Sequence, residues 1–173
     1  KSSLNKLVIG VIGLGYVGLP VAVALSKFYK TVGFDVNLNR IKNLRNNIDT
    51  NGDIEKKYLK KSKVLYSNKT KELRECNIYI VTVPTPITKS KKPDLSLIKN
   101  ATFLIGKMLK KNDIVIYEST FYPGTVRDIC VPILEKISNL VLNSTFFVGY
   151  SPERINPGDK KRKIENIKKI VSG

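Results

Sequence analysis

The chain has 173 residues, 42% of them hydrophobic, which is enough for about one domain with a buried core. Its net charge of +17 would suit binding to nucleic acid or to a membrane surface. However, no aromatic residues interleave with the lysines in a pattern that would stack on bases, so we interpret the lysines as solvent-exposed surface residues. We therefore expect neither nucleic acid nor a membrane as a partner. Histidine is absent and only two cysteines occur, which excludes a His-based zinc site or triad and a disulfide framework, and we expect a cytoplasmic setting.

Apolar strands and amphipathic helices alternate along the chain. Strands are predicted at 7–13, 30–35, 64–67, 77–83, 113–119 and 144–150. Helices are predicted at 20–28, 37–47, 71–76, 95–109 and 125–137, with a short helix or loop at 53–62 and a closing helix and strand within 164–173. Asp94 should cap the helix after it, and Pro132 should kink its helix. The pattern predicts an α/β fold, a Rossmann-like doubly wound parallel sheet with helices on both faces, formed by one domain over 1–173.

The segments that follow five of the predicted strands are rich in glycine, proline and functional side chains. They read GLGYVG, FDVN, VPTP, YESTFYPG and GYSPERINPG. In open parallel sheets, ligands bind beyond the carboxyl ends of the strands. We therefore expect these five segments to line one common site.

The first segment fits the dinucleotide pattern G-x-G-x-x-G, with Gly13, Gly15 and Gly18 between a strand and a helix. These glycines would permit a tight turn, a close approach of pyrophosphate and close packing of the helix on the strand. Asp35, at the end of the next strand, would accept hydrogen bonds from a ribose diol and repel a 2′-phosphate, which favours NAD over NADP. Arg40 could serve a phosphate or lie on the helix surface, and the alternative to the whole motif is a structural turn with a surface aspartate.

Hydroxyl groups follow the middle strands. Thr85 lies in the proline-stiffened VPTP segment, and either a cofactor contact or a plain strand end is compatible with its pattern. Thr120 could hold a water molecule or the nicotinamide side, whereas Ser119 or Thr120 could equally cap the next helix. Cys76 and Cys130 have no neighbouring base, so both are interpreted as packing residues.

Prolines 152 and 157 bracket Glu153 and Arg154 in the last segment, so this loop should be rigid. Its acid and guanidinium could contact a substrate, or they could pin the loop by hydrogen bonds. The residues alone leave both readings open.

The five segments together resemble the UDP-glucose/GDP-mannose dehydrogenase family. Its N-terminal NAD-binding domain is similar to this chain over residues 6 to 173, in the order and spacing of the stretches GLGYVGLPVAVAL, FDVNLNRI, VPTPI, YESTFYPGTV and GYSPERINPGDK. These stretches are most similar in sequence to the branch of the family that acts on UDP-N-acetylhexosamines. The resemblance implies that NAD is contacted by Gly13, Gly15, Tyr16, Val17, Gly18, Asp35, Arg40, Thr85 and Thr120. It also implies a catalytic role for Glu153 and Thr120 and contact with the sugar by Glu153, Arg154, Ile155 and Asn156.

The reaction implied by the resemblance is an NAD-dependent, two-step oxidation of the sugar C6 hydroxyl to a carboxylate, for surface polysaccharide synthesis. It passes through a thiohemiacetal and a thioester on a cysteine thiolate. Members that act on UDP-glucose place a second glutamate four residues after the first, where this chain has Pro157, so UDP-glucose is disfavoured as the substrate.

The family's nucleophilic cysteine lies C-terminal to this domain, and neither Cys76 nor Cys130 matches its motif. We therefore expect a cofactor domain of a longer, homodimeric enzyme that binds NAD but does not turn over alone.

Two rival functions remain at this point. The first is a non-catalytic Rossmann module that senses a dinucleotide. The second, more remote, is a basic nucleic-acid binder, which would show salt-dependent affinity that survives loss of Asp35.

Overall fold

The computed structural model describes residues 7–87, 93–120, 122–152 and 172. Glu153, Arg154, Ile155 and Asn156, which were predicted to contact the sugar, lie outside the described residues, as does the closing helix and strand predicted within 164–173 apart from Ser172.

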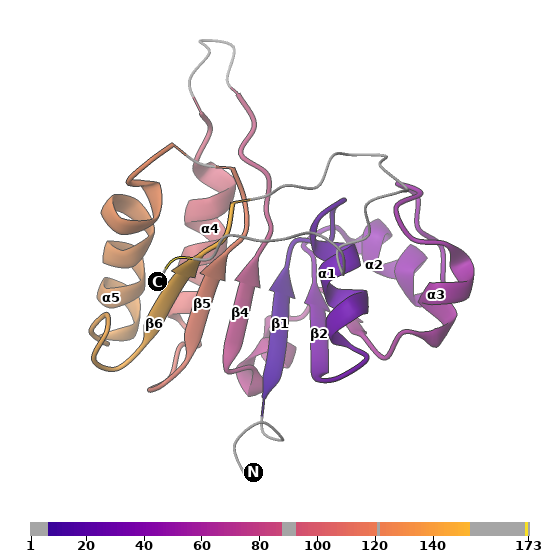
Figure 1. Ribbon diagram of the computed structural model, residues 1–173, viewed down its shortest axis with the longest axis horizontal. Helices are drawn as coiled ribbons and strands as arrows, with labels where there is room; N and C mark the ends of the chain where they lie inside the picture. Colours follow the sequence, from indigo (N-terminus) through magenta and orange to yellow (C-terminus); the bar gives the residue numbers. More distant parts are fainter. Residues whose placement is uncertain (1–6, 88–92, 121, 153–171, 173) are drawn as a thin grey trace.

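Six parallel strands form one sheet in the order β3-β2-β1-β4-β5-β6 (Figure 1). The strands are β1 (Val8–Ile12), β2 (Lys30–Phe34), β3 (Leu65–Ser67), β4 (Ile78–Val81), β5 (Ile114–Tyr117) and β6 (Phe147–Tyr150). The chain starts in the middle of the sheet, builds outward to β3, and then returns to add β4 on the other side of β1. This order confirms the predicted doubly wound sheet, and the reversal beside β1 creates the crevice in which such sheets bind ligands.

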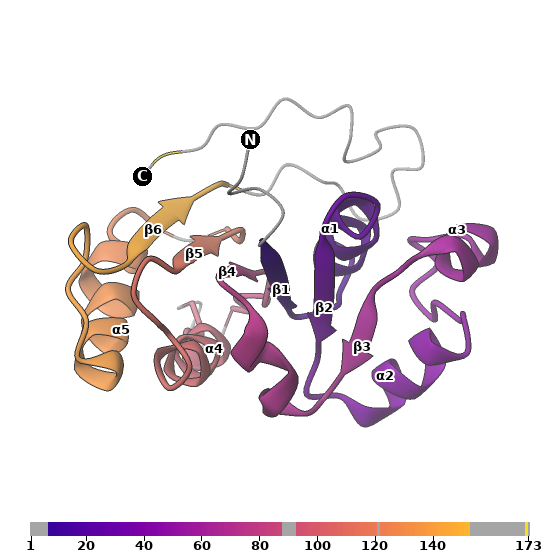
Figure 2. The ribbon, with the colours of Figure 1, turned by 90° about the horizontal axis from the view of Figure 1, so that it is seen from below.

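Helices cover both faces of the sheet. They are α1 (Gly18–Leu25), α2 (Leu38–Arg45), α3 (Lys56–Lys61), the 3-10 helix η2 (Thr70–Glu75), α4 (Ser96–Gly106), the π-helical segment η3 (Val126–Cys130) and α5 (Val131–Ser138). Figure 2 shows α1 on one face and α4 and α5 on the other. Among the described residues, no helix has the length and apolar character needed to cross a membrane.

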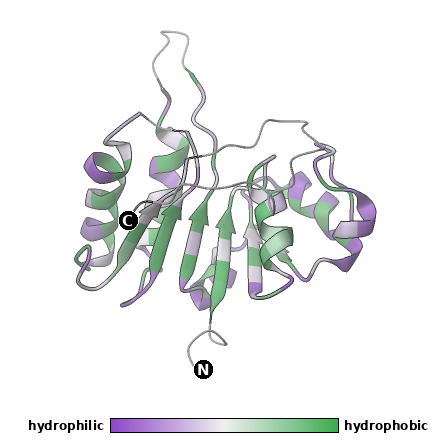
Figure 3. Ribbon diagram, viewed as in Figure 1, coloured by the Kyte–Doolittle hydropathy of each residue, from purple (hydrophilic) through white to green (hydrophobic). Residues whose placement is uncertain are grey.

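Two apolar clusters hold these layers together. One joins the strands to α1, α2 and α3 through residues such as Leu19, Leu44 and Leu59, and the other joins them to η2, α4 and α5 through residues such as Ile105 and Leu134. The central strands are apolar along most of their length (Figure 3), because both of their faces are covered. Each fully buried leucine contributes about 1.5–3 kcal/mol to folding, so the sheet forms a firm platform for the loops at its edge.

The helix over 125–137 differs from the expectation of a simple proline kink. Val126–Cys130 form a π-helical turn in which the N–H of Val131 donates to the carbonyl of Val126, and α5 follows with Pro132 in its first turn. Pro132 has no N–H and cannot donate to the residue four positions earlier, so the wide turn lies just before it.

Asp94 was predicted to cap the helix after it, but the N-cap residue of α4 is Leu95 and no side chain caps the helix there. Asp94 Oδ1 accepts the Ser96 N–H at 2.9 Å, and this hydrogen bond lowers the pKa of the carboxyl group. The helix begins at Ser96, one residue later than predicted, so Asp94 lies one position before the N-cap and binds the first helical N–H from there.

Candidate functional site

All strand carboxyl ends lie at one edge of the sheet, the upper edge in Figure 1, because the strands are parallel. The glycine turn follows β1, Asp35 follows β2, Thr85 follows β4, and Thr120 follows β5. The sheet therefore brings the predicted cofactor residues within the described chain to the same rim.

Gly13 and Gly18 are required by the close packing of the first turn. Gly13 has φ +94°, and a Cβ there would meet the Thr82 carbonyl at 3.2 Å. A Cβ at Gly18 would collide with the Gly13 carbonyl oxygen and with the Thr82 hydroxyl. The Thr82 hydroxyl lies 2.7 Å from the Gly13 oxygen and 3.0 Å from that of Ile12, and it fixes the turn from the residue that follows the neighbouring strand β4.

Thr82 was missed by the sequence analysis. A threonine at the end of a β-branched strand is common, and nothing local marks it as a partner of the glycine turn. Its role depends on the pairing of β4 with β1, which places it beside Gly13.

Gly15 has a different role, because a Cβ at this position would have no heavy atom within 4 Å. It leaves open space in front of α1, whose N-cap residue Val17 provides no side-chain cap and whose first turn contains no acidic residue. The N-terminus of a helix offers N–H groups and a partial positive charge to an anion. The turn thus fits a pyrophosphate, which would meet backbone rather than side chains.

Tyr16 and Val17 complete the predicted turn but face different surroundings. The side chain of Val17 is buried in the apolar cluster on the α1 face, so this residue has only its backbone to offer a ligand. Tyr16 is 39% exposed at the rim and its side chain is accessible.

Asp35 is tied to the glycine turn and is more than a surface aspartate. Its Oδ2 accepts the Leu14 N–H at 2.8 Å, and its Oδ1 accepts the Asn37 N–H at 2.9 Å. A carboxylate has about four lone-pair sites, so two remain for ribose hydroxyls. The same side chain can position the turn and bind a sugar diol.

A hollow of about 270 Å³ lies beside this carboxylate, and its lining includes Leu14, Gly15, Asp35, Asn37, Arg40 and Thr50. It combines backbone of the glycine turn with a carboxylate and amide groups, which suits the polar adenosine half of a dinucleotide.

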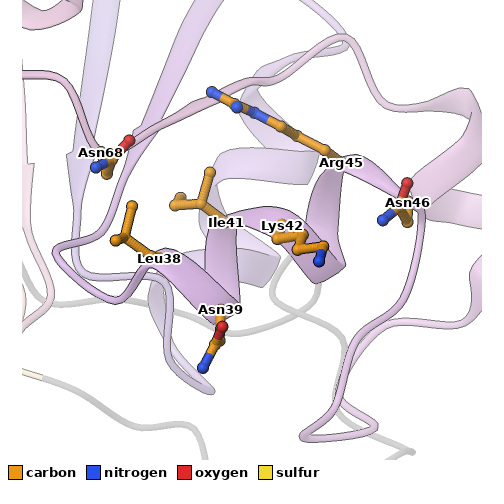
Figure 4. Close-up of a pocket in the computed structure, with 7 residues that line it drawn as sticks. All are labelled: Leu38, Asn39, Ile41, Lys42, Arg45, Asn46 and Asn68. Carbon is orange, nitrogen blue, oxygen red and sulfur yellow. The ribbon is translucent and has the colours of Figure 1, made fainter.

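A larger hollow, of about 380 Å³, lies on the outer flank of α2 (Figure 4) and is lined by Leu38, Asn39, Ile41, Lys42, Arg45, Asn46 and Asn68. No acidic residue and no glycine of the turn line it, and the Arg45 guanidinium donates to the Tyr66 carbonyl at 2.8 and 3.0 Å. The smaller hollow is therefore the one lined by the residues predicted to bind the cofactor, Gly15, Asp35 and Arg40.

Arg40 is buried, which shows that the alternative of a helix-surface residue was wrong. Only 8% of it is exposed, its Nε donates to the Leu14 carbonyl at 2.9 Å, and its Nη1 donates to Asp49 Oδ1 at 2.6 Å and to Thr50 Oγ1 at 3.3 Å. Asp49 was missed by the sequence analysis, because its contact depends on how the loop after α2 folds back. Arg40 lines the smaller hollow and also supports the glycine turn.

Thr85 and Thr120 lie together, with the Thr85 hydroxyl donating to the Thr120 carbonyl at 2.7 Å. The bond joins the ends of β4 and β5, and the side chain of Thr120 is exposed at the rim. Ser119 does not cap a helix, since its hydroxyl donates to the Val83 carbonyl at 2.8 Å and the next helical segment begins only at Val126.

Both cysteines are buried apolar groups, as the sequence analysis interpreted them. Cys76 and Cys130 have no exposed surface, and burial raises the pKa of both thiols, that of Cys76 to about 12. A nucleophilic cysteine needs a stabilised thiolate, so neither has the environment of a catalytic nucleophile.

Comparison with known proteins matches residues 7–173 to the model of the UDP-glucose/GDP-mannose dehydrogenase family, NAD binding domain. Two curated relatives are the UDP-N-acetyl-D-glucosamine 6-dehydrogenases of Pseudomonas aeruginosa and Salmonella typhi, 52% and 49% identical over 98% of this chain and 40% of each relative.

Solved structures show the same architecture. The UDP-D-ManNAc dehydrogenase of Pyrococcus horikoshii is 30% identical with a TM-score of 0.81, over 88% of this chain and 37% of that one. The NDP-N-acetyl-D-galactosaminuronic acid dehydrogenase of Methanosarcina mazei is 28% identical with a TM-score of 0.84, over 96% and 38%. The chain thus spans about 40% of the length of the curated relatives it matches.

Proposed function

The chain belongs to the UDP-glucose/GDP-mannose dehydrogenase family, whose NAD binding domain it matches over residues 7–173, and from this premise we propose that it is the cofactor-binding part of a nucleotide-sugar 6-dehydrogenase. The complete enzyme would oxidise the C6 hydroxyl of a UDP-N-acetylhexosamine to a carboxylate in two steps. The product, a uronate, would enter surface polysaccharide synthesis.

One observation carries the choice of substrate. The chain is 52% identical, over 171 residues, to a protein described as UDP-N-acetyl-D-glucosamine 6-dehydrogenase, against 30% to one described as UDP-N-acetyl-D-mannosamine dehydrogenase. Pro157, at the position where members acting on UDP-glucose place a glutamate, supports the same choice.

NAD, when bound, supplies the hydride acceptor for both oxidation steps. The residues of this chain bind and orient it. The turn of Gly13, Gly15 and Gly18 presents N–H groups and the start of α1 to the pyrophosphate, and Asp35 accepts hydrogen bonds from the ribose diol.

The other half of the cofactor would lie over the ends of β4 and β5. The hydrogen bond from Thr85 to the Thr120 carbonyl holds these two ends together, and the exposed Thr120 would position the nicotinamide or a water molecule. Fixing the reactive ring against the sugar removes orientational freedom before the chemical step. The segment with Glu153, Arg154, Ile155 and Asn156 would contact the sugar, with Glu153 assisting proton transfer.

The nucleophile would come from outside these 173 residues, because the thiols of Cys76 and Cys130 are buried and protonated. The chain alone would therefore bind NAD without completing the reaction. The complete enzyme would act as a homodimer in the cytoplasm.

The test is to express the complete product of the gene and to supply NAD with UDP-N-acetyl-D-glucosamine, UDP-N-acetyl-D-galactosamine or UDP-glucose. We expect formation of two NADH for each UDP-N-acetylhexosamine and little with UDP-glucose, measured by absorbance. NAD binding without NADH formation from any UDP-sugar would instead support a non-catalytic dinucleotide sensor.

A further inference from the structure

We propose that Asp49 determines the preference for NAD over NADP, because it holds the Arg40 guanidinium in an ion pair and keeps it from a 2′-phosphate. The proposal rests on the proposed function only in assuming that a dinucleotide occupies the glycine turn. It assigns a specificity role to a residue that would not itself touch the cofactor.

Arg40 is the cation placed at the ribose end of the site. It lines the same hollow as Asp35 and Gly15, and its Nε donates to the Leu14 carbonyl within the glycine turn. An arginine at this position of a dinucleotide fold can accommodate a 2′-phosphate. A preference for NAD therefore requires that something in the structure keep Arg40 from binding a 2′-phosphate.

The ion pair with Asp49 provides that explanation. Arg40 Nη1 lies 2.6 Å from Asp49 Oδ1, and the exposed fractions of the two side chains are 8% and 1%. Asp49 is itself fixed, since its Oδ1 also accepts the Asn51 N–H at 3.1 Å and its Oδ2 accepts the Ile54 N–H at 2.8 Å. Separating a buried ion pair leaves uncompensated charge and is strongly unfavourable, so a phosphate would have to compete with a preformed partner.

Arg40 also keeps some donor capacity. Its Nη2 is buried and has no hydrogen-bond partner among the described residues. A guanidinium has five N–H donors in a fixed fork, so a small rotation could turn this group toward a new anion. The ion pair between Asp49 and Arg40 Nη1 would oppose that rotation.

The charges around the hollow act in the same direction. Asp35 lines the same hollow as Arg40, and Asp49 is paired with Arg40. The pKa of Asp53 is raised first by burial and then by the charge of Asp49, and the charge of Arg40 lowers it. With Asp49 engaged, the positive charge of Arg40 is balanced and the carboxylate of Asp35 dominates the ribose end. A 2′-phosphate, with about two negative charges, would be repelled.

The experiment measures dissociation constants for NAD and NADP by calorimetry on the 173-residue chain and on Asp49→Asn. Asparagine preserves side-chain size and one acceptor oxygen but removes the charge. We expect the preference for NAD over NADP to fall about tenfold, because one charge-assisted contact to phosphate becomes available. In the double variant Arg40→Gln with Asp49→Asn this gain for NADP should disappear.

Asp53→Asn is the matched control, because it removes a carboxylate whose charge interacts with Arg40 and Asp49 but which, among the described residues, forms no ion pair with Arg40. Its preference should stay within about twofold of the wild type. Asp49→Ser serves as a second variant if the asparagine impairs folding, which circular dichroism would reveal.

Each outcome decides the question. An unchanged ratio in Asp49→Asn, with both affinities equally weakened, would show a purely structural role and overturn the proposal. So would an equal shift in Asp53→Asn, which would point to general charge, or loss of folding in both Asp49 variants. Failure of the wild type to bind either dinucleotide would instead overturn the assumed cofactor site, and with it this inference.

Discussion

Replacing Asp35 by alanine would affect two roles that one carboxylate performs. Its Oδ2 accepts the N–H of the fully buried Leu14, and its Oδ1 accepts the N–H of the exposed Asn37. The second donor would find water, but the first would lose its partner in a partly buried turn at a cost of about 1–3 kcal/mol. For a domain of this size, each kcal/mol corresponds to roughly 2–4 °C in the melting temperature.

The second role is binding. Hydrogen bonds to a charged acceptor contribute about 1.5–3 kcal/mol, so loss of the ribose contacts should weaken NAD binding roughly 10–100-fold. Calorimetry would give the affinity for NAD and NADP, and thermal unfolding by circular dichroism would give the stability. NADP should suffer less than NAD, because the carboxylate that repels its phosphate is gone.

Asp35→Asn separates the two roles. Its amide oxygen can still accept the Leu14 N–H, so stability should remain close to that of the wild type, while NAD affinity should fall because the charge is lost. If Asp35→Ala bound NAD as tightly as the wild type, the assignment of Asp35 to the ribose would be refuted. If Asp35→Asn fully retained the preference for NAD, the electrostatic part of the argument would fail.

Three further outcomes are expected. Gly15→Ala should leave unfolding unchanged in the absence of ligand, since the added methyl meets nothing within 4 Å, but it should weaken NAD binding about tenfold or more by occupying the space for phosphate. Gly18→Ala should instead destabilise the ligand-free chain in urea unfolding, because its methyl collides with the Gly13 carbonyl. Iodoacetamide should modify Cys76 and Cys130 slowly in the native chain even at mildly alkaline pH and rapidly in urea; rapid native modification, followed by mass spectrometry, would contradict the buried, protonated thiols.

The glycine turn and Asp35 could be predicted from sequence because each depends on local requirements. A positive φ at Gly13, close packing at Gly18 and a carboxylate at the end of β2 are all encoded within a few residues of the motif. The doubly wound parallel sheet could be predicted from the alternation of strands and helices with right-handed crossovers, whereas the order of its strands comes from the structure.

The contacts that were missed come from segments that the fold brings together. Thr82 reaches Gly13 only because β4 pairs with β1, and Asp49 reaches Arg40 only because the loop after α2 folds back over it. The alternative that Arg40 lies on the helix surface was wrong for the same reason, since its position on an amphipathic helix does not reveal a buried carboxylate partner. The π-helical turn before Pro132 was not predicted either, because a proline within a helical pattern indicates a kink but not the form that the kink takes.

The most direct test of the account is a calorimetric titration of the 173-residue chain with NAD and, separately, with NADP. The account predicts one NAD site per chain and clearly weaker binding of NADP, because the open glycine turn and the paired Asp35 form a preorganised site. Binding of neither dinucleotide, or tighter binding of NADP than of NAD, would contradict it.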